Sequence, residues 1–114
     1  LIGHSLGAIF LVKYLSENSL QAKIKATILV AAPYDDETTE DLTDFKIKEI
    51  SRRFTEQAGK VVLFNGLDDP VISRSDLRKY QQQLPTAEFH ILPAPDHFVR
   101  ADFPELVDVV KGVT

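Results

Sequence analysis

The run Gly3-His4-Ser5-Leu6-Gly7 constrains the fold of this 114-residue chain more than any other feature of its sequence. It follows two apolar residues, and it leads into Leu6–Glu17, which is apolar almost all round, as a buried helix is. A serine flanked by glycines two residues away is typical of a sharp, strained turn between a strand and a helix. A side chain at Gly3 or Gly7 is expected to collide there. The run therefore predicts the end of a buried strand, a strained turn at Ser5 and a buried helix.

The remainder of the chain alternates between predicted strands and predicted helices. Strands are expected at residues 24–32, 60–64 and 89–92, and helices at residues 47–58, 73–83 and 104–113. Gly59 stands where a left-handed residue would end the helix before it. Strict alternation with one helix per crossover predicts an α/β fold with a parallel sheet covered by helices. No repeat or linker interrupts residues 1–114, so one domain is expected.

Composition excludes several kinds of chemistry. The chain has no Cys, which excludes disulfides, thiolate zinc sites, iron–sulfur clusters and a cysteine nucleophile, and which suits a cytoplasmic protein. A net charge of -4 argues against a surface that binds nucleic acid. The longest uncharged apolar stretch, Leu6–Val12, is far shorter than the roughly 20 residues of a membrane-spanning helix. We expect neither a nucleic-acid partner nor a membrane span.

Two further segments carry expectations about the shape of the domain. The chain contains no Met and starts in the middle of an apolar run, so we expect that its N-terminus is not the native one. The stretch from Pro33 to Asp44 is acidic and nearly free of apolar residues, which predicts a surface excursion that can form part of the rim over a site.

The residues that carry chemistry follow the predicted strands. A serine nucleophile needs a base and a group that orients the base, and Ser5 is followed along the chain by Asp68 and Asp69 and then by His97. Each lies on a loop at the carboxyl end of a predicted strand, where open α/β sheets place their sites. The N–H of Leu6, at the start of a helix, can donate to a developing oxyanion. The spacing predicts Ser5, His97 and one of the two aspartates as catalytic residues.

With these motifs the chain resembles the α/β-hydrolase superfamily, and within it the small serine hydrolases of the retinoblastoma-binding-protein-9 type. The resemblance runs from GHSLGA, through the strand at residues 60–64 and Asp68-Asp69-Pro70, to His97-Phe98 and Pro104-Glu105-Leu106. It implies a three-layer sandwich with helices on both faces of the sheet, and a Ser–Asp–His triad that needs no cofactor. It assigns the acid to Asp69, directly before the proline, and leaves Asp68 as a turn residue that binds its own backbone.

The chain departs from this family in two ways. Asp96 stands where relatives often have Gly before the histidine, and its carboxylate could compete with Asp69 for His97. Family members also have about half of their sheet ahead of the serine turn, including the loop that supplies a second oxyanion N–H. We therefore expect that these N-terminal strands are missing from this chain. Loss of one oxyanion donor typically costs about 10²- to 10³-fold in rate.

The resemblance implies hydrolysis of a carboxylic ester or related small acyl compound. His97 would take the proton of Ser5 as Ser5 attacks the carbonyl, Asp69 would orient the imidazole, and water would then release the acyl group. Two alternatives remain open: a binding module whose triad is idle, and acyl transfer or lyase chemistry with the same residues.

The other two histidines are expected to be structural. His4 should pack or form a hydrogen bond below the turn, and His90 alternates with apolar neighbours in a strand, where it should be partly exposed. The spacing of His90, Asp96 and His97 matches no zinc pattern, so no metal site is expected.

Overall fold

Four parallel strands form the sheet at the centre of the molecule. The computed structural model describes residues 1–35, 42–47 and 49–114. The strands are β1 (Ile2–His4), β2 (Ala26–Val30), β3 (Lys60–Gly66) and β4 (Glu88–Leu92), and they lie side by side in the order of the chain. Gly3 pairs with Leu29, Leu29 with Leu63 and Leu63 with Phe89. All four strands therefore end at the same edge of the sheet.

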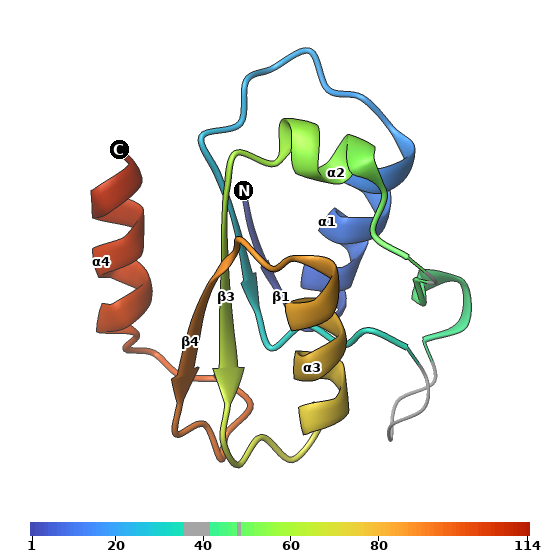
Figure 1. The fold of residues 1–114 in the computed structure, drawn as a ribbon. Helices are drawn as coiled ribbons and strands as arrows, with labels where there is room; N and C mark the ends of the chain where they lie inside the picture. The colour runs from blue at the N-terminus through green and yellow to red at the C-terminus, as the bar shows by residue number, and fades with distance from the viewer. Residues whose placement is uncertain (36–41, 48) are drawn as a thin grey trace.

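Helices cover both faces of this sheet (Figure 1). The connections between strands contain α1 (Leu6–Glu17), the short 3₁₀ helix η1 (Thr43–Phe45) with α2 (Arg52–Gln57), and α3 (Arg74–Gln83), and these helices lie on one face. When parallel strands lie side by side in chain order and every crossover has the same handedness, the crossover helices all lie on the same face of the sheet. The last helix, α4 (Pro104–Val113), packs on the other face. The predicted α/β fold, a parallel sheet with helices on both faces, is confirmed. None of the helices in the described part of the chain is both long and apolar enough to cross a membrane.

The two faces of the sheet bury separate apolar clusters. Leu29 and Leu63 point toward α1, α2 and α3, and they share a core with the buried side chains of those helices, Ala8, Ile9, Val12, Leu15, Phe54 and Tyr80. Val30, Val62 and Phe64 point to the other face, where α4 contributes Leu106, Val109 and Val110. Strands that are buried on both faces explain the continuous apolar runs in the sequence.

The helix predicted at residues 47–58 is wrong in its first half, because α2 begins only at Arg52. Ile47 and Ile50 are buried as the periodicity indicated, but tertiary hydrogen bonds hold their backbone in an irregular segment. The N–H of Ile47 donates to the carbonyl of Tyr34, and the N–H of Ile50 donates to the side chain of Gln83. The apolar spacing of residues 47–58 therefore predicts the buried positions correctly but not the backbone conformation of the first half.

Three further predictions from the sequence are confirmed in whole or in part. Gly59 has a φ of 69° after the end of α2, and a Cβ there would lie 2.5 Å from two carbonyl oxygens, so the predicted left-handed position is confirmed. Ser73, the first residue of the helix predicted at residues 73–83, caps α3. The excursion from Pro33 to Asp44 is only partly at the surface, since Tyr34 and Leu42 are buried; its residues 36–41 lie outside the described residues.

The carboxylate of Asp76 joins α3 to the segment after β2. It is fully buried, and it accepts hydrogen bonds from the backbone N–H of Tyr34 (3.0 Å) and the backbone N–H of Ser73 (3.2 Å), while its own N–H donates to the Ser73 hydroxyl. Burial raises the pKa of Asp76 above its ordinary value of 3.8, and the backbone hydrogen bonds oppose this shift. The phenol of Tyr80 fixes the same segment by donating to the carbonyl of Pro33 at 2.7 Å.

We predict that Asp76→Ala lowers the free energy of unfolding by about 3 kcal/mol at pH 7, since it removes the buried carboxylate that accepts the N–H groups of Tyr34 and Ser73. Because the native pKa of Asp76 is raised, the native state holds this proton more tightly than the unfolded chain does. The stability advantage of the wild type over Asp76→Ala should therefore shrink as the pH rises from about 3.8 through the native pKa. Urea denaturation at several pH values measures both effects. A variant as stable as the wild type at pH 7 would contradict the first.

Candidate active site

Ser5 occupies a strained turn between β1 and α1, as the sequence predicts. Its φ and ψ are 55° and -119°, a conformation that residues other than glycine seldom adopt. Its backbone N–H donates to the carbonyl of Val30 in β2 (2.8 Å), and its carbonyl accepts from Ala8 in the first turn of α1 (3.0 Å). The turn is thus fixed on both sides by the strand next to it and by the helix that follows.

The two glycines of the turn differ in what their positions tolerate. A Cβ on Gly3 would lie 2.6 Å from the carbonyl oxygen of Gly7 and 2.8 Å from the Cα of Ala8, so the helix passes as close as expected. A Cβ on Gly7 would meet no atom of the described residues within 4 Å, apart from its chain neighbours and its own helix backbone. The expectation of a collision is confirmed for Gly3 and is wrong for Gly7, because Gly7 lies on an exposed side of α1.

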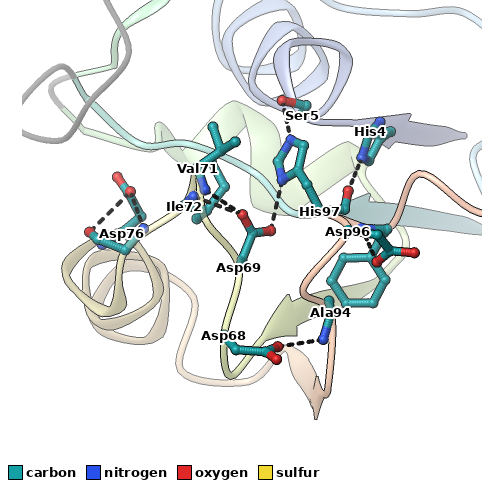
Figure 2. Close-up of polar contacts among 12 residues, drawn as sticks. His4, Ser5, Asp68, Asp69, Val71, Ile72, Asp76, Ala94, Asp96 and His97 are labelled. Carbon is teal, nitrogen blue, oxygen red and sulfur yellow. Dashed lines mark hydrogen bonds and ion pairs between the residues drawn. The ribbon is translucent and has the colours of Figure 1, made fainter.

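The structure brings Ser5, His97 and Asp69 together in one line of hydrogen bonds (Figure 2). The Oγ of Ser5 lies 2.9 Å from Nε2 of His97, and Nδ1 of His97 lies 2.7 Å from Oδ2 of Asp69. A carboxylate can only accept, so Nδ1 carries the proton in this arrangement and Nε2 can accept one from the serine hydroxyl. The Asp69 side chain is 0% exposed and that of His97 is 13% exposed, which shields the imidazole–carboxylate contact from water.

The loop after β3 fixes the orientation of Asp69. Oδ1 of Asp69 accepts the backbone N–H groups of Val71 (2.8 Å) and Ile72 (3.0 Å), which leaves Oδ2 for His97. Asp68 points elsewhere: its Oδ1 accepts the N–H of Ala94 at 2.7 Å, on the loop after β4. Asp69, the residue that the resemblance favoured, therefore contacts His97. Asp68 instead links the loop after β3 (the acid loop) to the loop after β4 (the histidine loop). The expectation that Asp68 binds its own backbone is wrong.

The loop after β4 presents His97 in a strained conformation. His97 and Phe98 have φ values of 57° and 58°, both in the left-handed region. Asp96 does not compete with Asp69 for the imidazole, because its carboxylate faces the other way: Oδ1 accepts the N–H of Phe98 (3.1 Å), and both oxygens contact Arg100. The hydrogen bonds from Arg100 lower the pKa of Asp96 below its ordinary value.

His4 and His90 have the kind of surroundings that the sequence predicts. His4 is exposed, and its Nε2 lies 2.7 Å from the carbonyl oxygen of His97, so it joins the serine turn to the histidine loop. His90 is partly exposed in β4, with its ring stacked on Phe64 at 4.8 Å and its Nε2 3.3 Å from Glu88. Within the described ranges no three His, Asp or Glu side chains form a group that could hold a metal ion.

Leu6 is the first residue of α1, the position predicted for an oxyanion donor. The first four N–H groups of a helix have no partner within the helix, and the helix dipole favours negative charge near them. The N–H of Leu6, next to Ser5 in the chain, is thus at the positive end of the helix, where an N–H can donate to an anionic oxygen.

Comparison with known proteins agrees with this fold and places the chain in a family. The model of the serine hydrolase family matches residues 1–106, so the chain belongs to the serine hydrolase family. Among solved structures it is similar to the ydeN gene product from B. subtilis, with a TM-score of 0.82 and 21% sequence identity over 99% of this chain. The chain spans 63% of the length of that protein. A search of curated proteins finds no match.

The sequence did not predict the contacts that hold the loops of the site in place. His4 and Asp68 were expected to be local structural residues, and no role was assigned to Arg100. The sequence does contain one indication of the Asp96–Arg100 contact, because the two residues are four apart and have opposite charges. That spacing brings side chains together only where the backbone between them is helical or turned.

Gly66 lies where the acid loop and the histidine loop meet, and we predict that it does not tolerate a side chain. A Cβ there would lie 2.8 Å from the Cβ of Ala94 and 3.0 Å from the Cβ of Asp69. Gly66→Ala should lower the free energy of unfolding by about 1–3 kcal/mol, because both loops must move apart. Gly112→Ala, in an open position of α4, is the matched control and should cause no loss. Equal urea midpoints for the two variants would contradict the prediction.

Proposed function

We propose that this serine hydrolase cleaves a carboxylic ester or a related acyl compound, with Ser5 as nucleophile, His97 as general base and Asp69 as the residue that orients His97. The observation that carries this proposal is the unbroken line of hydrogen bonds from Ser5 Oγ through the imidazole to Asp69. Asp69 in turn is held by two backbone N–H groups, so the base has a fixed tautomer and a fixed direction. The nearer likeness, to hydrolases of the retinoblastoma-binding-protein-9 type, rests on the GHSLGA run and on the aspartate before Pro70.

The geometry supports a two-step reaction. In the first step Ser5 Oγ attacks the acyl carbonyl carbon while its proton passes to Nε2 of His97, and the imidazolium then gives this proton to the leaving alcohol. In the second step a water molecule attacks the acyl-serine, His97 accepts a proton from the water, and the carboxylic acid leaves as Ser5 recovers its proton. Asp69 stays ionised throughout and stabilises the imidazolium.

The oxyanion that forms in each step needs a donor close to Ser5. The N–H of Leu6 supplies one at the positive end of α1. The strained backbone of Ser5 presents its hydroxyl to His97, directly before this N–H in the chain.

We predict that Ser5→Ala reduces hydrolysis of an activated ester such as p-nitrophenyl acetate on the order of 10⁶-fold, toward the uncatalysed rate. It should also abolish covalent labelling by a fluorophosphonate. The exposed Ser19, after α1, gives the control: Ser19→Ala should keep both activities. Retained turnover in Ser5→Ala would refute the assignment, and a wild type that never labels would favour a binding module with an idle triad.

Substitutions of Asp69 and of Asp68 should have clearly different effects on kcat. Asp69→Asn should lower kcat by about 10⁴-fold, because an amide that donates to Nδ1 selects the wrong tautomer of His97. Asp68→Asn keeps an oxygen that can accept the N–H of Ala94 and should lower kcat by less than about 10-fold. A larger loss for Asp68→Asn than for Asp69→Asn would reverse the assignment of the acid.

A further inference from the structure

The loop that carries His97 is held by a pair of charged residues outside the line of hydrogen bonds. We propose that Asp96 and Arg100 are positioning residues, which keep the backbone of residues 93–100 in the conformation that places the His97 imidazole between Ser5 and Asp69. This inference rests on the proposed function for its kinetic consequences, but the position of the imidazole can be measured without it.

The backbone of this loop needs such support. His97 and Phe98 are consecutive residues with φ values of 57° and 58°, and neither is glycine. Left-handed residues of this kind persist only where their surroundings determine them. The loop has two backbone hydrogen bonds of its own, from His97 N–H to the carbonyl of Ala94 and from Val99 N–H to the carbonyl of Asp96, both at 3.1 Å.

Arg100 ties together separate points of the loop. Its Nη2 donates to Oδ1 of Asp96 (2.7 Å) and its Nε to Oδ2 (3.2 Å), a two-point contact between guanidinium and carboxylate. The same Nη2 donates to the carbonyl of Pro93 at 3.3 Å. Because Oδ1 of Asp96 also accepts the N–H of Phe98, the pair fixes the loop before His97 and directly after it.

The guanidinium also packs on aromatic rings. Its carbon lies 4.9 Å from the centroid of Phe98 and 5.6 Å from that of Phe103, and the two rings stack on each other at 5.3 Å. Phe98 is buried in the cluster on the α4 face of the sheet. Arg100 therefore connects the exposed carboxylate of Asp96 to a fixed part of the core, which a lysine could not do in the same way.

Helical ion pairs of the same spacing serve as a comparison. Arg52 and Glu56 in α2 form one contact of 2.9 Å, and both side chains are mostly exposed. Arg52→Gln removes the same charge as Arg100→Gln at a site far from His97 in the chain, so it is the matched control.

The test compares Arg100→Gln, Arg100→Lys and Asp96→Asn with the wild type and with Arg52→Gln. Two properties are measured: ester hydrolysis, and the proton NMR signal of His97 Nδ1–H in its hydrogen bond to Asp69. We expect each of the three loop variants to lower kcat by about 10-fold at an unchanged KM and to broaden or remove the Nδ1–H signal, with the melting temperature preserved. Arg100→Lys should not rescue either property, since lysine cannot form the two-point contact. Arg52→Gln should match the wild type.

Several results would overturn the inference. Loop variants that keep the Nδ1–H signal of the wild type show that the pair does not position His97, whatever their activity. A loss of the signal that accompanies an equal loss of melting temperature shows a general role in stability instead. If the wild type hydrolyses no ester but Arg100→Gln still loses the Nδ1–H signal, the proposed function fails while the positioning of His97 by the pair is upheld.

Discussion

The hydrogen bond between Ser5 and His97 depends on two strands that end at the same edge of the sheet. These residues are 92 positions apart in the chain, and His97 and Asp69 are 28 apart. Parallel pairing of β1, β2, β3 and β4 brings the three loops to one edge, and the register across Gly3, Leu29, Leu63 and Phe89 sets how far each strand extends toward it. With a different register the side chains of Ser5, Asp69 and His97 would lie too far apart to form hydrogen bonds.

Strain is concentrated where these loops meet. Of the four non-glycine residues with positive φ among those described, Ser5, His97 and Phe98 lie at the site, and Ala31 follows β2 beside it. Three of them are held by contacts from another element: Ser5 by the carbonyl of Val30, Ala31 by the carbonyl of Phe64, and His97 by its contacts with His4 and Asp69. Phe98 is buried in the cluster on the α4 face of the sheet. The buried sheet beneath supplies the rigidity that such conformations require.

The sequence predicted the parts of this arrangement that follow from local patterns. A strand, a serine between glycines and an apolar helix fix the turn at Ser5, and apolar runs that end in polar loops fix where Asp69 and His97 emerge. Burial of Ile47 and Ile50 was also visible, but their backbone conformation was not, because distant partners such as Gln83 decide it. For the same reason the roles of Asp68, His4 and Arg100 could not be predicted: each contacts a loop whose path depends on the folded sheet.

The proposed reaction requires an acyl group on Ser5, and this intermediate can be observed directly. Rapid acid quenching of the protein during turnover of p-nitrophenyl acetate, followed by peptide mapping by mass spectrometry, would locate any trapped acetyl group. We expect one acetyl group on the peptide that contains Ser5, at that serine, and none in the Ser5→Ala variant. An acetyl group on another residue, or turnover with no acylated serine at any time, would contradict the proposed reaction.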